Sequence, residues 1–218
     1  MSALDTVVKF FNDSGVAIYF SLTIMAVGVS IAIERFIFLQ RQRADNRRMW
    51  DKMLPLLQHG KLDKAASLAA SADVAIGKII TYGLERLRAP HRREDVDAAM
   101  EEGMMEIVPR LEKRTHYIAT LANVVTLVGL LGTIIGLIKA FTAVANVNPA
   151  EKAEMLSASI SIAMNNTAFA LMVAIPFLLI HAFLTARATE IVDSLEAAKI
   201  SFLNLTQRVN AEVRRAAE

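Results

Sequence analysis

The chain has 218 residues, of which 54% are apolar and 21% are charged, and its mean hydropathy is +0.39. Soluble domains of this length usually fall below zero on that scale, so the composition favours a membrane protein. The net charge of +2 gives no general case for a nucleic-acid-binding protein, and the absence of cysteine excludes disulfides, thiolate metal sites and cysteine nucleophiles. The four histidines lack metal-ligand spacing, so we expect no metal site and no cofactor.

Three apolar runs are long enough to cross a bilayer, because a helix needs about 20 apolar residues to span hydrocarbon roughly 30 Å thick. We assign the transmembrane helices to residues 14–34, 118–138 and 155–186. Asp5 and Asp13 precede the first run where a signal peptide would be basic, so we expect a membrane helix there and not a cleaved leader. The sequence predicts an all-α membrane protein with three transmembrane helices and long cytoplasmic helical extensions.

The basic residues predict the orientation of these spans. Residues 35–117 hold sixteen Lys and Arg and residues 187–218 hold five, whereas residues 139–154 hold two and residues 1–13 hold one. The positive-inside rule therefore places 35–117 and the tail 187–218 in the cytoplasm, and 1–13 and the loop 139–154 outside, in the periplasm. The basic cluster within 41–48 could contact anionic lipid, but charge that sets topology on a solvated helix is the simpler interpretation.

The cytoplasmic segment 35–117 is helical in character. We expect proline and glycine to divide it into short amphipathic segments, at Pro55, Gly60, Gly77, Gly83 and Pro90. Apolar residues recur every three or four positions over 93–111, which predicts a helix that runs straight into the second span. No stretch alternates with a period of two residues, so we expect no sheet.

The third span begins with a favourable helix entrance. Asn148 can act as the N-cap, Pro149 suits the first helical position, and Glu151 completes a capping box. The apolar periodicity continues to Val209, so we expect one helix from residue 149 to about 213, kinked within the bilayer at Pro176.

Small and polar residues share one face in each of the last two spans. The residues predicted to pack helices together are Gly129, Gly132, Gly136, Ala163, Ala170 and Pro176. The residues predicted to line an ion pathway are Thr133, Asn165, Asn166 and Thr167, because adjacent asparagines within a span are costly unless they face protein, water or an ion. No Asp, Glu, Lys or Arg lies inside a span, so a titratable proton carrier has to come from a partner.

Two stretches resemble the signatures of a known family. Residues 128–136, VGLLGTIIG, and residues 163–176, AMNNTAFALMVAIP, are similar to the second-span and third-span signatures of the MotA/TolQ/ExbB proton-channel family. Glu34 and Arg35, at the inner end of the first span, also fit. The order of three spans agrees with the ExbB/TolQ-like branch, because the flagellar stator branch has four spans.

The resemblance implies a motor subunit of the bacterial inner membrane. It implies a homopentamer around two copies of an ExbD/TolR-like single-span protein, whose membrane aspartate carries the ion. Ion flow would drive rotation and transmit work to the envelope, through a TonB/TolA-like envelope-spanning protein where one is present. Thr133 and Thr167 fall on the family's two pore-facing threonine positions.

The chain departs from the family pattern in the third span. Ile162 stands where ExbB and TolQ members usually carry a glutamate, Ala170 replaces a common glycine, and Asn165 and Asn166 replace small or apolar residues. The transported ion is expected to be H+, with Na+ as the alternative because threonine hydroxyls and asparagine amides supply oxygen ligands.

A non-conducting membrane scaffold is the alternative function to a motor subunit. A small transporter is a third class, but a transporter would show internal repeats that this chain lacks. No phosphate-binding loop, nucleophile elbow or H-E-x-x-H motif is present, so we expect no enzyme.

Overall fold

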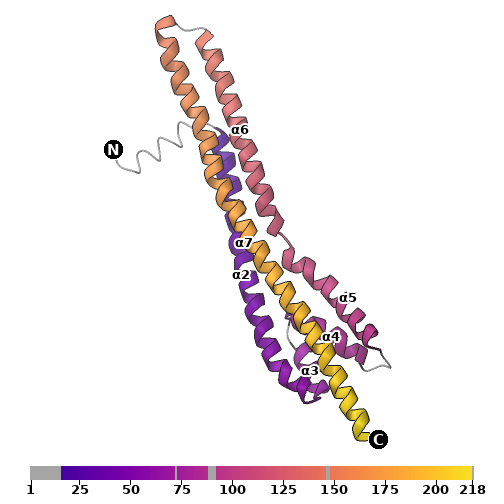
Figure 1. Cartoon of the computed structure of the whole chain (residues 1–218). Coiled ribbons are helices and arrows are strands. Elements are labelled where there is room, and N and C mark those ends of the chain that lie inside the picture. The colour runs from indigo at the N-terminus through magenta and orange to yellow at the C-terminus, as the bar shows by residue number, and fades with distance from the viewer. Residues whose placement is uncertain (1–15, 72, 88–91, 146–147, 218) are drawn as a thin grey trace. The chain divides into compact units, whose positions relative to one another are not determined.

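The computed structural model describes residues 16–71, 73–87, 92–145 and 148–217, which form six helices and no strand (Figure 1). The helices are α2 (Val16–Gln58), α3 (Leu62–Ala70), α4 (Ala75–Leu87), α5 (Arg93–Glu112), α6 (Thr115–Ala145) and α7 (Pro149–Ala217). Windows long and apolar enough to cross a membrane lie in α2, α6 and α7. The predicted all-α membrane fold with three spanning helices is confirmed.

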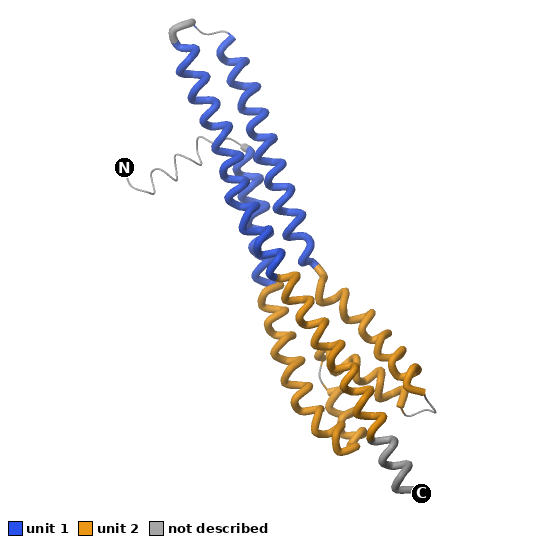
Figure 2. Tube along the Cα trace, in the orientation of Figure 1, with its two compact units in different colours: residues 1–34, 114–183 blue, residues 35–113, 184–218 orange. Residues whose placement is uncertain are grey.

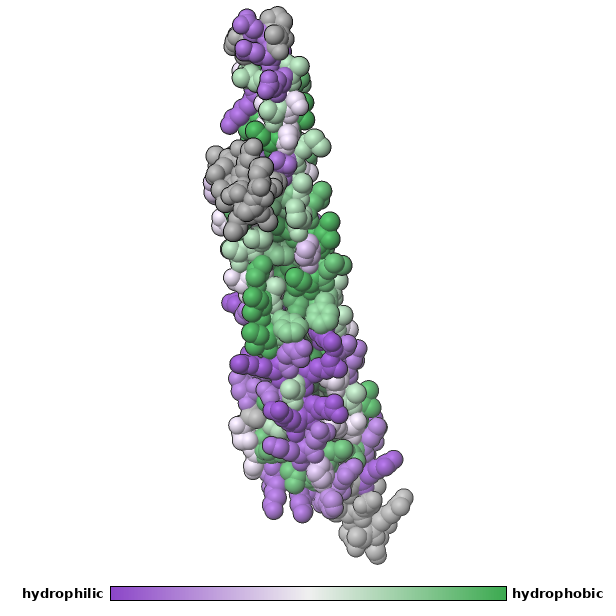
Figure 3. All heavy atoms as spheres, turned by 90° about the vertical axis from the view of Figure 1, so that its left-hand side faces the viewer, coloured by the Kyte–Doolittle hydropathy of each residue, from purple (hydrophilic) through white to green (hydrophobic). Residues whose placement is uncertain are grey.

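The chain divides into two compact units (Figure 2). Unit 1 comprises residues 1–34 and 114–183, and unit 2 comprises residues 35–113 and 184–218. Figure 3 shows that the visible face of unit 1 is largely apolar, with a hydrophilic tip on the α6–α7 hairpin. The visible face of unit 2 is mainly hydrophilic. The surface of unit 1 is therefore suited to lipid or to other membrane helices, and that of unit 2 to water.

Contacts at glycines fix the register of the three helices in unit 1. Gly132 of α6 lies beside both Ala17 of α2 and Asn166 of α7, and Gly28 of α2 lies beside Phe177. The two α2 positions are 149 residues earlier than their α7 neighbours, so α2 runs parallel to α7 and level with it. The described part of the first span, 16–33, accordingly lies level with residues 165–182 of α7.

The α6–α7 hairpin extends beyond the described start of α2. Because Ala17 is level with Gly132, the 13 residues 133–145 of α6 continue for about 20 Å past that level at 1.5 Å per residue. Most of the segment 139–154 is therefore helical. Helix α7 begins at Pro149, as expected, and the Glu151 amide donates to the Asn148 carbonyl at 3.0 Å.

Unit 2 is a bundle of short helices around an apolar core. Helix α3 packs on α4 and α4 on α5. The buried core residues include Met53, Leu57, Ile79, Ile80, Met100, Leu111, Ile191, Leu195 and Phe202. Asn46, only 4% exposed, accepts a hydrogen bond at 3.0 Å from the Ile76 amide, so a side chain of α2 caps the start of α4.

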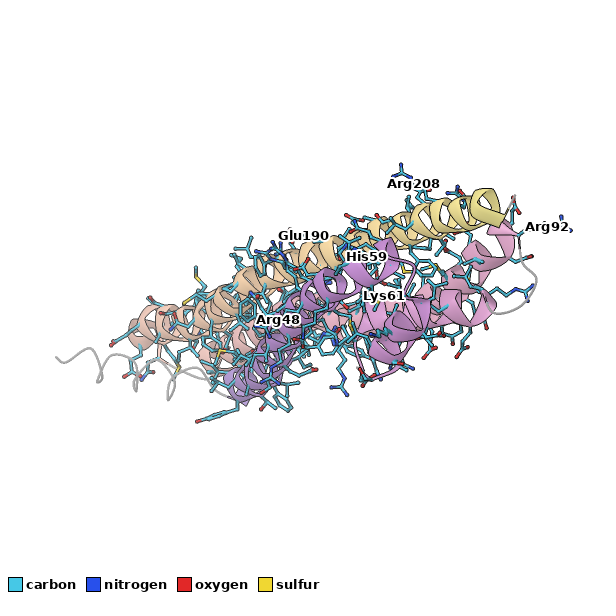
Figure 4. All side chains as sticks on the ribbon, turned by 90° about the horizontal axis from the view of Figure 1, so that it is seen from below. Arg48, His59, Lys61, Arg92, Glu190 and Arg208 are labelled. Atoms are coloured by element: carbon cyan, nitrogen blue, oxygen red, sulfur yellow. The ribbon has the colours of Figure 1, made fainter. Side chains whose placement is uncertain are left out.

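Many charged side chains lie on the surface of unit 2. Arg48 and Arg208 point away from the helices, and Glu190 forms an ion pair at 3.1 Å with Arg43 (Figure 4). Lys199 is 14% exposed and contacts Glu101 and Asp97 at 2.6 and 3.2 Å. Burial by itself would lower the pKa of Lys199, but the hydrogen bonds to these two carboxylates outweigh burial and raise it.

Three of the five expected breaks in 35–117 do not occur, so that prediction is wrong at those positions. Pro55 lies in the last turn of α2, where few residues follow it, and Gly77 and Gly83 lie inside α4. Gly83 packs closely, because an added Cβ would stand 2.9 Å from side-chain atoms of Met100 and Phe202 and these would have to shift. Gly60, with φ of 66°, does follow the end of α2, and Pro90 lies outside the described residues.

The expected continuous helix from 93 into the second span is also wrong, because α5 and α6 are separate. The Lys113 amide donates to the Pro109 carbonyl at 3.0 Å, and Arg114 adopts a left-handed φ of 67°. A residue in this conformation ends a helix, and Pro109 already weakens the last turns of α5 because it has no N–H. The Arg35 side chain donates a hydrogen bond to the Leu111 carbonyl. This carbonyl is one of the last four of α5, which have no hydrogen-bond partner within the helix.

Candidate ion pathway

The structure brings Thr133 and Thr167 together where α6 meets α7. Both side chains are half-buried, and their Oγ1 atoms are in hydrogen-bond contact. Each hydroxyl also lies 3.1 Å from the Gly129 carbonyl, and Thr133 Oγ1 lies 3.4 Å from the Ala163 carbonyl. A hydroxyl has one proton and two lone pairs, so one threonine donates to the other, the second donates to a backbone carbonyl, and lone pairs remain free. The pair is thereby a site that accepts hydrogen bonds.

Small residues allow this contact by letting the two helices approach closely. An added Cβ on Gly129 would collide with the Cβ of Ala170, and one on Gly136 would stand 2.8 Å from the Cβ of Ala163. Both alanines are fully buried. These contacts join helices of one chain, so glycine and alanine build the subunit itself.

The two asparagines do not join the threonine pair. Asn166 is 7% exposed and packs with its Cβ and Cγ against Gly132, and its Oδ1 has no hydrogen-bond partner among the described residues. Asn165 is half-buried and precedes Thr167 by two positions, which at 100° per residue places the two about 160° apart around α7. The four predicted pathway residues therefore occupy three separate places.

Pro176 lies inside α7 with its ring exposed, so it makes no buried packing contact within the described chain. Because proline has no N–H, the Met172 carbonyl one turn earlier lacks its helical hydrogen bond. The kink expected at this residue stays a prediction.

An ion pair lies at the end of the spans near Glu34. In unit 1, Arg114 contacts Glu34 at 3.4 Å, and both side chains are about half exposed. An exposed ion pair of this kind contributes little to stability. Its position marks the edge of the apolar segment.

Sequence reasoning missed Asn123, which the structure places exposed on α6 inside the second span. It makes no hydrogen bond among the described residues. Its spacing of three residues before Thr126 and ten before Thr133 could have indicated it, because these positions share one side of a helix. The close contact of Gly28 with the Phe177 ring was also missed, since nothing in the sequence pairs those two positions.

Comparisons with known proteins relate this sequence to one family. Residues 71–197, which contain α6 and the first two-thirds of α7, match the family model described as the MotA/TolQ/ExbB proton channel family. A biopolymer transport protein ExbB homolog of Methanothermobacter thermautotrophicus is 26% identical over 197 residues, which cover 89% of this chain and 68% of that protein. A biopolymer transport protein ExbB-like 3 of Synechocystis is 28% identical over 154 residues, which cover 70% of this chain and 72% of that protein.

Proposed function

Because the chain belongs to the MotA/TolQ/ExbB proton channel family, we propose that this ExbB-like membrane subunit forms part of an ion-driven motor. Five copies surround two copies of an ExbD/TolR-like single-span protein, whose membrane aspartate carries the proton. A TonB/TolA-like protein that spans the envelope receives the mechanical work. The observation that carries this proposal is the contact between Thr133 and Thr167, in two spans, 118–138 and 155–186, that contain no Asp, Glu, Lys or Arg.

The acceptor character of the threonine pair suggests how the proton controls the partner. A neutral carboxylic acid donates an O–H, which the free lone pairs of Thr133 or Thr167 can accept. A carboxylate has no proton to donate, and both threonine protons are already in use, one between the two hydroxyls and the other toward a backbone carbonyl. The protonated aspartate therefore docks and the ionised one leaves, which links each proton transfer to a step of the partner.

The arrangement of oxygens favours H+ over Na+. A sodium site needs several oxygens around one point. Only the hydroxyls of Thr133 and Thr167 meet, while Asn166 packs against Gly132 and Asn165 lies on another flank of α7. The asparagine amides therefore add no oxygen ligand to the threonine pair.

The charge distribution supports the inner membrane and the predicted orientation. Residues 1–13 and the loop 139–154 lie in the periplasm, and residues 35–117 and 187–218 lie in the cytoplasm. The hydrophilic surface of unit 2 suits the aqueous compartment that the positive-inside rule assigns to it.

The test is proton flux in liposomes that contain the complex purified with its native partner. Thr167→Val and Thr133→Val keep the side-chain shape and remove the hydroxyl. Loss of one hydrogen bond to the carrier, worth about 1–1.5 kcal/mol, should reduce flux roughly tenfold. The control is Thr23→Val on α2, because the exposed Thr23 donates to the Tyr19 carbonyl of its own helix.

Native mass spectrometry of the same samples should give pentamers for every variant. Normal flux in both threonine variants would return Thr133 and Thr167 to a packing role, and absence of flux from the wild-type complex would favour the non-conducting scaffold. A stable monomer would contradict the assembly, and flux that requires sodium at fixed pH would contradict the assignment of the ion.

A further inference from the structure

Asn123 is the exposed polar side chain whose position in unit 1 is hardest to reconcile with lipid. The antiparallel register that sets Gly129 beside Ala170 places Asn123 level with Pro176, and therefore level with Val27 of α2. This depth is well inside the first span. A carboxamide moved from water to hydrocarbon without a hydrogen bond loses about 2–7 kcal/mol. Asn123 therefore requires water or a polar group supplied from outside the described chain.

Two threonines share the edge of α6 that carries Asn123. At 100° per residue, Thr126 lies about 20° and Asn123 about 80° round from Thr133, on the same side of the helix. The glycines that pack against α7 lie on the other side of Thr133. Thr126 is half-buried, and its hydroxyl donates to the Ala122 carbonyl at 2.9 Å, so its lone pairs also remain free.

This edge reaches an aqueous boundary at the Glu34 end of the span. His116 lies seven residues before Asn123, about 20° further round, and its side chain is exposed. The register places His116 level with Glu34, which closes the first span. From Thr133 to Asn123 the helix rises about 15 Å, and His116 lies about 10 Å beyond. The polar edge therefore extends from the threonine pair to the end of the apolar segment.

We infer that Asn123 and Thr126 form a hydrated track that carries the proton between the Thr133–Thr167 pair and the compartment on the Glu34 side. This inference rests on the proposed function, because it extends the same pathway. The hydroxyl of Thr126 accepts hydrogen bonds from water, and the carboxamide of Asn123 both donates and accepts them. Together they hold water molecules in a stretch that lacks any ionisable side chain.

The chain has no cysteine, so single cysteines can report hydration at each position. Asn123→Cys and Thr126→Cys are compared with Val124→Cys, which adjoins Asn123 at the same depth, about 100° round the helix and 39% exposed. Membrane vesicles that contain the full complex are treated with a charged, membrane-impermeant thiol reagent from the Glu34 side. Because the thiolate is the reactive species and forms only in contact with water, we expect the two track positions to react at least tenfold faster than Val124→Cys.

Two further cysteines separate this inference from the proposed function. Thr133→Cys reports the threonine pair and is treated with the same reagent from the side of the 139–154 loop, so that its labelling does not depend on the track. Leu131→Cys, 54% exposed on the far side of α6, is its control. If Asn123→Cys reacts as slowly as Val124→Cys while Thr133→Cys reacts rapidly, the track is wrong and the pair stands. If Thr133→Cys also reacts as slowly as Leu131→Cys, the proposed pathway itself is contradicted.

Flux and assembly of two Asn123 variants complete the test. Asn123→Leu should leave pentamers intact and reduce proton flux about tenfold, and Asn123→Ser, which keeps a small polar group, should recover most of the flux. Asn123→Leu could instead dissociate the pentamer, with normal flux from Asn123→Ser only in samples that stay assembled. That result would overturn the track and would make Asn123 a contact between subunits.

Discussion

Addition of one methyl group at Gly129 should separate α6 from α7 and disable the threonine pair. An ideal Cβ at this position would collide with the Cβ of Ala170, and it would also stand 3.2 Å from the Asn166 carbonyl oxygen and 3.3 Å from the Thr167 Cα. None of these atoms can move by a side-chain rotation, because each is backbone or attached directly to it. The helices therefore have to move apart in Gly129→Ala.

The size of the effect follows from these distances. Carbon atoms pack at about 3.5–4.0 Å, so the helices need to separate by roughly 1 Å. Overpacking of this kind costs about 1–3 kcal/mol. For a chain of this length each kcal/mol lowers Tm by about 2–4 °C. The same movement lengthens the 3.1 Å hydrogen bond from Thr167 to the Gly129 carbonyl beyond the range of a hydrogen bond.

The assay is thermal unfolding in detergent, followed by loss of the oligomer peak on size exclusion, together with proton flux. Gly129→Ala should lower both Tm and flux, whereas Val124→Ile, which adds a methyl at a 39% exposed position, should change neither. The double variant Gly129→Ala with Ala170→Gly removes the colliding methyl and should recover part of the lost Tm. A double variant no more stable than Gly129→Ala alone, or a single variant with wild-type Tm, would refute the packing argument.

Two further predictions concern unit 2. Asn46→Ala should reduce the free energy of unfolding by about 1–2 kcal/mol, because the buried Ile76 amide loses its acceptor, and an unchanged denaturation midpoint would contradict the cap. The raised pKa of Lys199 means that its contacts with Asp97 and Glu101 stabilise the fold below its ordinary pKa of 10.5 and that this contribution is lost as pH rises through the higher folded-state value. Lys199→Met should therefore lack a step of destabilisation above pH 10.5 that the wild type shows, and identical alkaline unfolding profiles would contradict the ion pairs.

The membrane fold was predictable because its signals are local. Apolar runs of about 20 residues identify spans without knowledge of tertiary contacts, and the cap at Asn148 locates the start of α7 from three neighbouring residues. The break between α5 and α6 was not predictable by the same reasoning. It depends on Arg114, a residue that seldom adopts a left-handed φ and carries no turn signal in the sequence.

The candidate site was predictable only in part, because residues adjacent in sequence point in different directions on a helix. Periodicity placed Gly129 and Thr133 on one face, and the structure sets both against α7. For Asn165 and Asn166, a polar character within the span was evident, but the flank that each occupies depends on the rotation of α7 against its neighbours. A rotation of 100° between consecutive residues is enough to bury one amide against Gly132 and leave the other half-exposed.

The depth of the threonine pair gives the proposed pathway an asymmetry. Thr167 is level with Ile18, four residues or about 6 Å inside the first predicted span, whereas about 24 Å of the same span separates that level from Glu34. With the proposed orientation, a proton from the periplasm meets the pair after a short distance and then has most of the membrane still to cross. The inner part therefore needs polar groups more than the outer part does, and Thr126 and Asn123 lie in that inner part.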